Sequence, residues 1–524
     1  MPDTQGSEAA RATTGRSVVS GGLWYVASYG IPQGYTLIVS IVAARFLGPD
    51  GMGRQSFIAF VSITTTSVLA SSMYVAVMRF IGETAGRGRN ELLPGLLWWA
   101  WRIEGIAALV GGGTLAAAAA LGAWPRGAWA AAAVVSFAGI LHSVPTAVLI
   151  GLQQFRRAAV VGLVTGLVGT GAVTVVLWQG GGITGMFATE AVVGMLNLLW
   201  TGTLARRSLA AVERGVEREP DRADLHVLRR SVGRYALLSA IGLFLELIVG
   251  TRSEFFFLAH FSGNAQIAFY SIAYSAVAAM RLIPKALAGA TAPAFATLYG
   301  AGAFDRIRSG YSRSLRLLLL VTLPLTAVGL SLGPELIEEV YGRNYAGADG
   351  PVQILLLAFP LIGLSSLATS LLAGYGKIRL PIVANAVAAV VDLGLAAGLV
   401  PVLDARGAAI ANAAGQGTFA LLLLVFAGRL VRPVDWRPDQ FVRAVALSVG
   451  VGLAGWITVN WIDGFPGLAA GAAASLVAFA VLAPTLGIVA ADDARWAEQS
   501  FGRRVGRLVR LVSGGSLPPA GGHE

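Results

Sequence analysis

The stretch from residue 35 to residue 63 reads YTLIVSIVAARFLGPDGMGRQSFIAFVSI and contains two apolar runs separated by a short glycine-rich turn. Both runs continue outward, which gives apolar segments at 19–45 and 55–78. A membrane-spanning helix needs about 20 predominantly apolar residues, so each segment is long enough to cross a bilayer. The sequence here therefore predicts two membrane spans joined by a short turn.

Composition extends this pattern to the whole chain. Of its 524 residues, 55% are hydrophobic, 13% are charged and none is cysteine, and the mean hydropathy is +0.69. Soluble domains carry about twice that charged fraction, so a soluble, disordered or disulfide-stapled chain is excluded. The lack of cysteine also excludes thiol chemistry and cysteine-ligated metal sites. We predict an all-α polytopic membrane protein with about 14 transmembrane helices.

The predicted spans resemble one another in length, with one exception. The eighth, at 266–298, is too long for one straight crossing, so we expect it to tilt, to extend past the bilayer or to kink at Pro284 or Pro293. The fourteen spans are 19–45, 55–78, 103–123, 128–151, 158–178, 184–205, 235–259, 266–298, 315–333, 351–373, 380–402, 407–429, 441–461 and 466–490.

Basic residues alternate between the connections of these spans. Most of the 39 lysines and arginines fall in connections expected on one side, whereas the other side carries Arg45, Arg54, Arg126, Arg343 and Arg406. Basic loops stay in the cytoplasm, which predicts a multi-pass protein of the cell membrane with both termini cytoplasmic. The net charge of +11 is then mainly an orientation signal, and we expect no nucleic-acid partner.

An internal repeat divides the first twelve spans into two sets of six. Phe46–Ser56 is paralleled by Phe261–Ser271 at an offset of 215, Leu149–Leu152 by Leu372–Tyr375 at 223, and Gly185–Ala188 by Gly407–Ile410 at 222. Two such halves, each with an even number of spans, are related by a pseudo-two-fold axis along the membrane normal. The predicted parts are a cytoplasmic tail (1–18), an N-lobe (19–205), a cytoplasmic linker (206–234), a C-lobe (235–430), two appended spans (431–490), and a basic amphipathic helix with a tail (491–524).

The motif ARFLGPDGMG at 44–53 resembles one in polysaccharide-biosynthesis (Wzx-like) flippases of the multidrug/oligosaccharidyl-lipid/polysaccharide exporter superfamily. The segments LLAGYGK at 371–377 and GAAIAN at 407–412 are similar to that group's sequences around spans ten to twelve. These motifs are structural, and we assign turn roles to Gly48, Pro49, Gly53 and Gly263. The resemblance implies alternating access of two lobes around a cationic central cavity. The implied cargo is a polyprenyl-diphosphate-linked oligosaccharide, flipped from the inner to the outer leaflet for cell-surface or exopolysaccharide biosynthesis.

Cations inside predicted spans are the first candidates for substrate binding, because each costs about 2.5–3.5 kcal/mol at a helix centre. Arg281 and Lys285 lie four residues apart in the eighth span, hence on one helix face, where two positive charges suit a diphosphate. The alternative is that they reach the inner headgroups, which suits Lys285 better than Arg281. Arg252, near the outer end of the seventh span, is a third candidate.

Four single acids within spans are candidates for ion coupling. Glu246 and Glu254 fall in the seventh span, Asp392 in the eleventh and Glu190 in the sixth. A carboxyl in such a place either binds a coupling ion or hydrogen-bonds neighbouring helices as a structural acid.

Motifs for nucleotide or metal chemistry do not occur in the sequence: it has no P-loop, no HExxH and no dinucleotide-binding fingerprint. We therefore expect no catalytic residue, metal or cofactor. We expect the energy for transport to come from H⁺, Na⁺ or the membrane potential. A lipid II flippase and a multidrug antiporter stay open as alternatives, although an antiporter for cations favours acidic residues. A polysaccharide polymerase or ligase is the enzymatic alternative, disfavoured because the predicted outer loops are short.

The C-terminal stretch 494–512 alternates arginines with apolar side chains. This pattern predicts a basic amphipathic helix on the anionic inner leaflet, so anionic lipids are expected partners. Other glycan-assembly proteins are the remaining expected partners.

Overall fold

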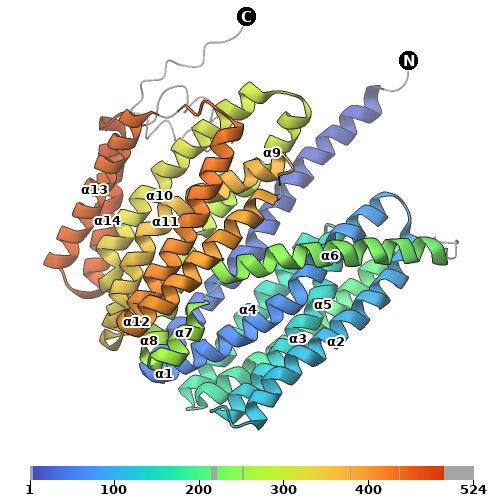
Figure 1. Cartoon of the computed structure of the whole chain (residues 1–524), viewed down its shortest axis with the longest axis horizontal. Helices are drawn as coiled ribbons and strands as arrows, with labels where there is room; N and C mark the ends of the chain where they lie inside the picture. The colour runs from blue at the N-terminus through green and yellow to red at the C-terminus, as the bar shows by residue number, and fades with distance from the viewer. Residues whose placement is uncertain (1–3, 214–220, 251–252, 378, 436, 489–524) are drawn as a thin grey trace, which may run out of the picture. The chain divides into compact units, whose positions relative to one another are not determined.

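A computed structural model describes residues 4–213, 221–250, 253–377, 379–435 and 437–488 (Figure 1). In these ranges the regular structure consists of α-helices and two short 3-10 helices. Twelve of the described helical segments are long and apolar enough to cross a membrane. The prediction of an all-α polytopic fold is therefore confirmed, whereas the predicted amphipathic helix at 491–524 lies outside the described residues.

Two of these twelve segments contain a break, so each holds two predicted spans. The first lies in α1, Thr4–Gly86, which breaks at Gly48, where φ is 66°, a value that glycine adopts without strain. The second is α12, Arg379–Leu430, which breaks at Asp404, where φ is 49° and ψ is −128°. The predicted first, second, eleventh and twelfth spans lie on these two helices, which reconciles twelve segments with fourteen crossings.

The chain forms two compact units, Met1–Phe255 and Phe256–Glu524. The first unit is built around α3, which packs against α1, α2 and α5, while α4 packs against α1 and α5. Its remaining elements after α1 are η1 (Asn90–Leu92), α2 (Leu93–Ala120), α3 (Arg126–Gly151), α4 (Phe155–Trp178), α5 (Gly182–Glu213) and α6 (Arg222–Gly250).

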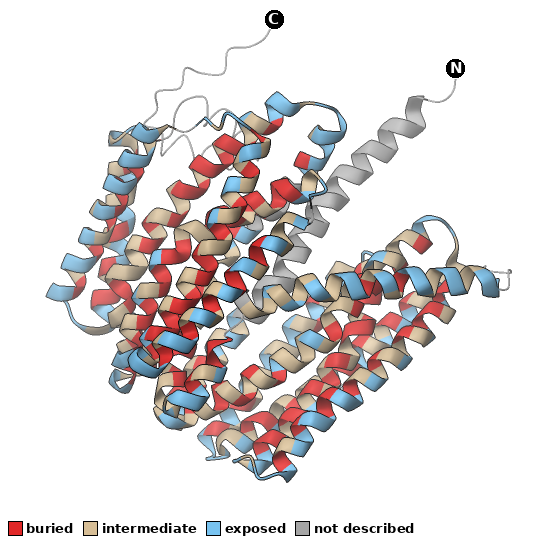
Figure 2. Cartoon of the chain, viewed as in Figure 1, coloured by how far each residue is buried: buried red, intermediate tan, exposed pale blue. Residues whose placement is uncertain are grey.

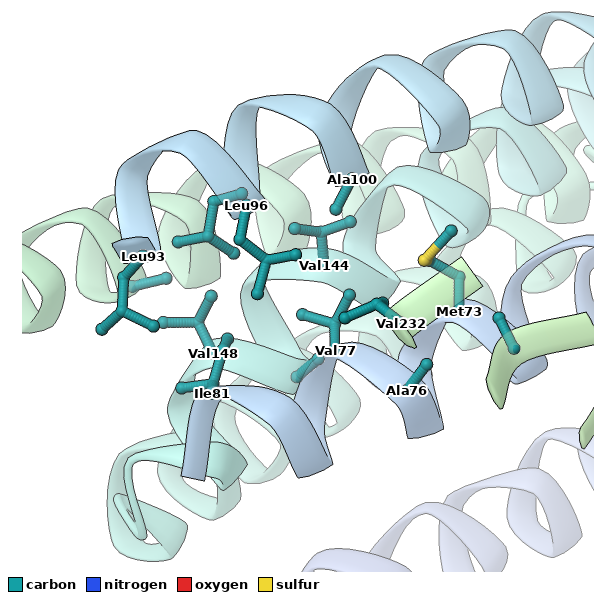
Figure 3. Close-up of a cluster of buried hydrophobic side chains, with 14 of the residues drawn as sticks. Met73, Ala76, Val77, Ile81, Leu93, Leu96, Ala100, Val144, Val148 and Val232 are labelled. Carbon is teal, nitrogen blue, oxygen red and sulfur yellow. The ribbon is translucent and has the colours of Figure 1, made fainter. Parts of the chain in front are cut away.

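The core of the first unit includes a cluster of buried side chains from α1, α2, α3, α5 and α6, which we call the inner cluster. Figure 3 shows how leucines and valines of these helices point toward one another. Its members are Met73, Ala76, Val77, Ile81, Leu93, Leu96, Leu97, Ala100, Val144, Ala147, Val148, Leu149, Ala205, Val232 and Ala236. The faces turned away from such clusters are exposed and apolar (Figure 2), as expected for helices surrounded by lipid.

The second unit is built around α11, which packs against α8, α9, α10 and α12. A hairpin of α13 and α14 packs on α10, so the two appended spans are part of this unit. The elements are α7 (Glu254–Phe261, at the division), α8 (Asn264–Met280), α9 (Leu282–Gly300), α10 (Phe304–Tyr341), η2 (Arg343–Ala348), α11 (Asp349–Gly374), α12, α13 (Pro438–Trp461) and α14 (Gly464–Thr485).

Helix α6 carries most of the predicted seventh span, which the sequence assigned to the C-lobe. In the structure α6 packs against α1 and α2 of the first unit. Val232 is fully buried in the inner cluster, and the Arg229 guanidinium donates to the Gly95 carbonyl at 2.8 Å. The first compact unit therefore ends later in the chain than the predicted N-lobe at residue 205, and the lobe boundaries stay a prediction.

The glycines that the sequence repeat pairs make the same kind of close contact in the two units. A Cβ on Gly151, at the end of α3, would lie 2.8 Å from the Met78 carbonyl oxygen of α1. A Cβ on Gly374, at the end of α11, would lie 3.0 Å from the Ala296 backbone nitrogen of α9. In both units, the absence of a side chain lets two helix backbones touch where a turn follows.

Replacing these glycines tests the two backbone contacts. Gly151→Ala and Gly374→Ala should each cost about 1–3 kcal/mol, because the new methyl group meets backbone that must shift. The measurement is thermal unfolding of the detergent-solubilised protein, followed as the fraction that stays monodisperse.

The control for this experiment is Gly113→Ala on α2, where an added Cβ meets nothing within 4 Å. That variant should match the wild type or exceed it slightly, since alanine favours helix over glycine. Equal unfolding temperatures for all three variants would contradict the proposed contacts.

Candidate functional site

The predicted eighth span is interrupted between α8 and α9, and Arg281 is the residue at the interruption. Pro284 has no backbone N–H, so the carbonyl of Met280 four residues earlier has no helical partner, and the proline ring crowds it. The helix accordingly stops after Met280 and restarts at Leu282. The expected kink therefore lies beside Pro284 rather than Pro293, whose neighbourhood is continuous helix.

Arg281 and Lys285 stay one turn apart across this break. The Lys285 N–H donates to the Arg281 carbonyl at 3.1 Å, which preserves their common face. Arg281 is half-buried, and its Nε is shielded from solvent without a hydrogen-bond partner among the described residues, while Lys285 is exposed. The pair thus combines a partly desolvated guanidinium with an exposed lysine side chain, a combination suited to phosphate oxygens.

The helices around this break approach closely. A Cβ on Gly363 of α11 would lie 2.7 Å from Thr322 Cγ2 of α10 and 3.3 Å from Pro284 Cγ of α9. One turn of α9 further on, the Ser370 hydroxyl of α11 donates to the Ala288 carbonyl at 2.9 Å. These contacts hold α9 against α10 and α11, so the helix that follows Arg281 is fixed in place by its neighbours.

Among the described residues, the other predicted site residues lie on different elements. Arg252 lies outside the described residues, and Glu254 begins α7, fully buried. Glu246 is exposed on α6, and Glu190 is half-buried on α5. Asp392 is fully buried in the first half of α12, facing Gly415 in the second half. The four acids thus lie on four different helices.

Two of the predicted turn residues differ in what their backbone requires. Gly48 has a φ of 66°, so a side chain there would be strained. Pro49 follows directly, whereas Gly53 lies in the helix after the break. Gly263 precedes α8 with φ −84° and ψ 164°, an ordinary extended conformation, and an added Cβ would meet nothing within 4 Å. The glycine at 263 is therefore not required by local geometry.

Glu104 is a buried acid that the sequence analysis did not single out. It is fully buried on α2, and both of its carboxylate oxygens are shielded without a hydrogen-bond partner. The third span was predicted from residue 103, which placed Glu104 at a membrane interface, whereas α2 begins ten residues earlier, at Leu93. The apolar run LLPGLLWWAW at 92–101 was the sequence signal for this longer helix.

Comparison with known proteins identifies the fold. Residues 239–397 match the model of the family described as MatE. No curated protein sequence matches the chain. The matched segment runs from α6 into α12 and includes the break at Arg281.

Solved structures of transporters resemble most of the chain. The lipid II flippase MurJ, in an inward closed conformation, has a TM-score of 0.67 at 12% identity, covering 88% of this chain and 99% of MurJ. An inward-facing multidrug resistance MATE family transporter of the MOP superfamily has a TM-score of 0.60 at 16% identity. The match covers 78% of this chain and 98% of that transporter. A MOP superfamily transporter from Pyrococcus furiosus has a TM-score of 0.54 at 15% identity. The match covers 80% of this chain and 96% of that transporter.

These matches define a polytopic membrane protein with the fold of the MATE and MurJ transporters. At this level of identity the likeness establishes the fold alone.

Single cysteines test the chemical environment of the Arg281–Lys285 face, because the natural chain has none. Lys285→Cys should react with water-soluble methanethiosulfonates, and an anionic reagent should react faster than a cationic one of similar size. The physical reason is the neighbouring Arg281 charge, which attracts the anion. Mass spectrometry of the intact protein gives both rates.

Two further variants complete this test. Ala273→Cys on α8, where the alanine is fully buried, should stay unreactive. Adding Arg281→Gln to Lys285→Cys should bring the two reagent rates together. Equal rates while Arg281 is present would show that its charge does not act at position 285.

Proposed function

We propose that the protein is a flippase that carries a polyprenyl-diphosphate-linked oligosaccharide from the inner to the outer leaflet by alternating access. The observation that carries this proposal is the Arg281–Lys285 pair at a break inside a membrane-spanning segment. Cations inside a membrane-spanning segment are costly, so they mark candidate sites for anionic ligands. A diphosphate offers several acceptor oxygens to two cations that lie one turn apart.

The chemistry of Arg281 favours an anionic cargo over a cationic drug. Its Nε lacks a partner among the described residues, although a shielded donor costs about 1–3 kcal/mol when left unsatisfied. A phosphate oxygen satisfies this donor, and Lys285 adds a second charge from the next turn. A cationic drug would meet repulsion from both side chains.

The fold supports transport rather than glycosyl transfer. Its structural neighbours bear the names of transporters and flippases, and the connections that the sequence predicts to be outer are short. The motifs ARFLGPDGMG and LLAGYGK add the resemblance to polysaccharide flippases. A polysaccharide cargo for the cell surface is therefore our first choice over a polymerase or ligase reaction.

Lipid II is the second candidate cargo. It is favoured by the likeness to MurJ, which covers 88% of this chain. Both cargoes present a diphosphate to Arg281 and Lys285, so the sugar decides between them. In either case the protein would work in the cell membrane with cytoplasmic termini, next to anionic lipids and glycan-assembly partners, and would draw on an ion gradient or the membrane potential.

Charge reversal tests the proposed diphosphate contact. In proteoliposomes, the Arg281→Glu, Lys285→Glu double variant should flip a fluorescent polyprenyl-diphosphate disaccharide about tenfold more slowly or worse. That loss corresponds to about 1.5–3 kcal/mol, the range for a hydrogen bond to a charged group. Arg281→Lys should recover part of the rate because it restores the charge without the planar fork.

The matched control is Arg306→Glu, which reverses an exposed charge of the same unit in the first turns of α10. It should flip the probe at the wild-type rate. Wild-type flipping by the double variant would refute the diphosphate contact, and a preference for lipid II over other glycans would select the second candidate.

A further inference from the structure

Glu104 lies on the buried face of α2, where the neighbouring buried side chains are apolar. The buried residues of α2 follow one face at helical spacing and include Ala100, Glu104, Ala108 and Leu115. Glu104 lies eleven residues after Leu93, about 16 Å along the helix, and is therefore far from the α2 N-terminus. An acid in this stripe must be buried whenever α2 is packed against its neighbours.

Apolar layers close the site on both sides along the helix axis. On one side Ala100 and Val144 belong to the inner cluster (Figure 3). On the other side Ala108 packs with Ala70 of α1 and Ile140 of α3 in a second cluster. Glu104 is therefore fully buried from solvent between these two apolar clusters.

One polar side chain approaches the carboxyl from the facing helix. Ser143 of α3 interacts with Glu104 across the α2–α3 interface. Neither Glu104 oxygen nor Ser143 Oγ completes a hydrogen bond in the described structure. A carboxylate in such surroundings would be uncompensated, at a cost of several kcal/mol, whereas a neutral carboxylic acid avoids that cost.

The charged groups on the neighbouring elements point elsewhere. On α3, His142 is hydrogen-bonded to Thr146 and to Thr201 of α5. On α2 itself, Arg102 is exposed and stacks over Trp98 at 4.7 Å. The remaining charged residues with described side chains on the elements that pack against α2 are Arg45, Asp50, Arg54, Arg79 and Glu83 on α1, Glu91 on η1, Arg126 on α3, and Arg222, Asp224, His226, Arg229, Arg230, Arg234 and Glu246 on α6. Neither carboxylate oxygen of Glu104 has a hydrogen-bond partner among the described residues.

We propose that Glu104 is a reversible proton-binding site within the first unit. Proton exchange then requires α2 to separate from α3, because the packed interface excludes water. Binding and release of the proton are thereby linked to the packing of these two helices. This inference goes beyond the proposed function, since it holds whatever cargo the Arg281–Lys285 pair binds.

The surroundings favour a proton over a metal ion. A bound Na⁺ or divalent ion collects several oxygen ligands, but Ser143 is the polar group found against Glu104. No group of three or more His, Cys, Asp or Glu side chains able to hold a metal occurs among the described residues. A carboxyl that keeps its proton needs no further ligand.

Dicyclohexylcarbodiimide tests the site, because it reacts with protonated carboxyl groups in apolar surroundings. The purified full-length protein should be labelled at Glu104, as located by mass spectrometry of its peptides. Labelling should fall as the pH is raised, because the reagent needs the protonated carboxyl, and Na⁺ at constant pH should not protect. Glu83, an ion-paired acid 2.8 Å from Arg87, serves as the internal control and should stay unlabelled.

A second measurement uses the linkage between proton binding and stability. Glu104→Gln mimics the neutral acid in size and should fold normally. In the wild type the unfolding temperature should fall as the pH rises, because the unfolded chain releases the Glu104 proton that the folded chain keeps. Glu104→Gln should lose this part of the pH dependence, while the control Glu83→Gln should retain it.

Three results would overturn the proposal. They are no labelling of Glu104 at any pH, protection by Na⁺ at constant pH, and a pH dependence of stability that Glu104→Gln leaves unchanged. Protection by Na⁺ would assign the carboxyl to a metal ion instead of a proton.

Discussion

The structure depends on the requirement that each backbone N–H and C=O inside a membrane find its partner within the protein. Helices meet it segment by segment, so regular helix is interrupted at few places within the spans. The breaks have a visible local basis: Gly48 and Asp404 have a positive φ, and Arg281 is followed by a proline three residues later. One of these breaks carries the basic pair on which the proposed function depends.

The same low-polarity surroundings explain why two charged side chains stand out. Arg281 is half-buried at an interrupted helix, where its guanidinium can meet a ligand. Glu104 is sealed in a continuous helix between apolar layers, where a ligand other than a proton has little room. Ionisable groups in a membrane protein can therefore serve two purposes, ligand binding and proton binding. The degree of burial and the continuity of the helix distinguish the two cases.

The sequence predicted the helices and the kink well, because both follow from local properties. The lengths of the apolar runs predicted the spans. Pro284 predicted the place where the helix of the long eighth span is interrupted, after Met280. Boundaries were weaker: a predicted start at residue 103 instead of Leu93 hid Glu104, because it placed this acid at the end of a span. Gly263 matched its repeat partner in sequence, yet its extended backbone does not require glycine, because a motif match does not report φ.

The sequence by itself determined the number of spans, their alternating charge and the residues that cannot be solvated cheaply in a membrane. These properties depend on composition and spacing along one chain. Only the tertiary structure decided which of those residues are enclosed: it packed α6 against α1 and α2, brought Gly151 onto the Met78 carbonyl and placed Glu104 against Ser143. The physical reason is that a side chain becomes buried, or loses its hydrogen-bond partners, only when another helix packs against it. Which helix packs there is decided by packing over the whole unit.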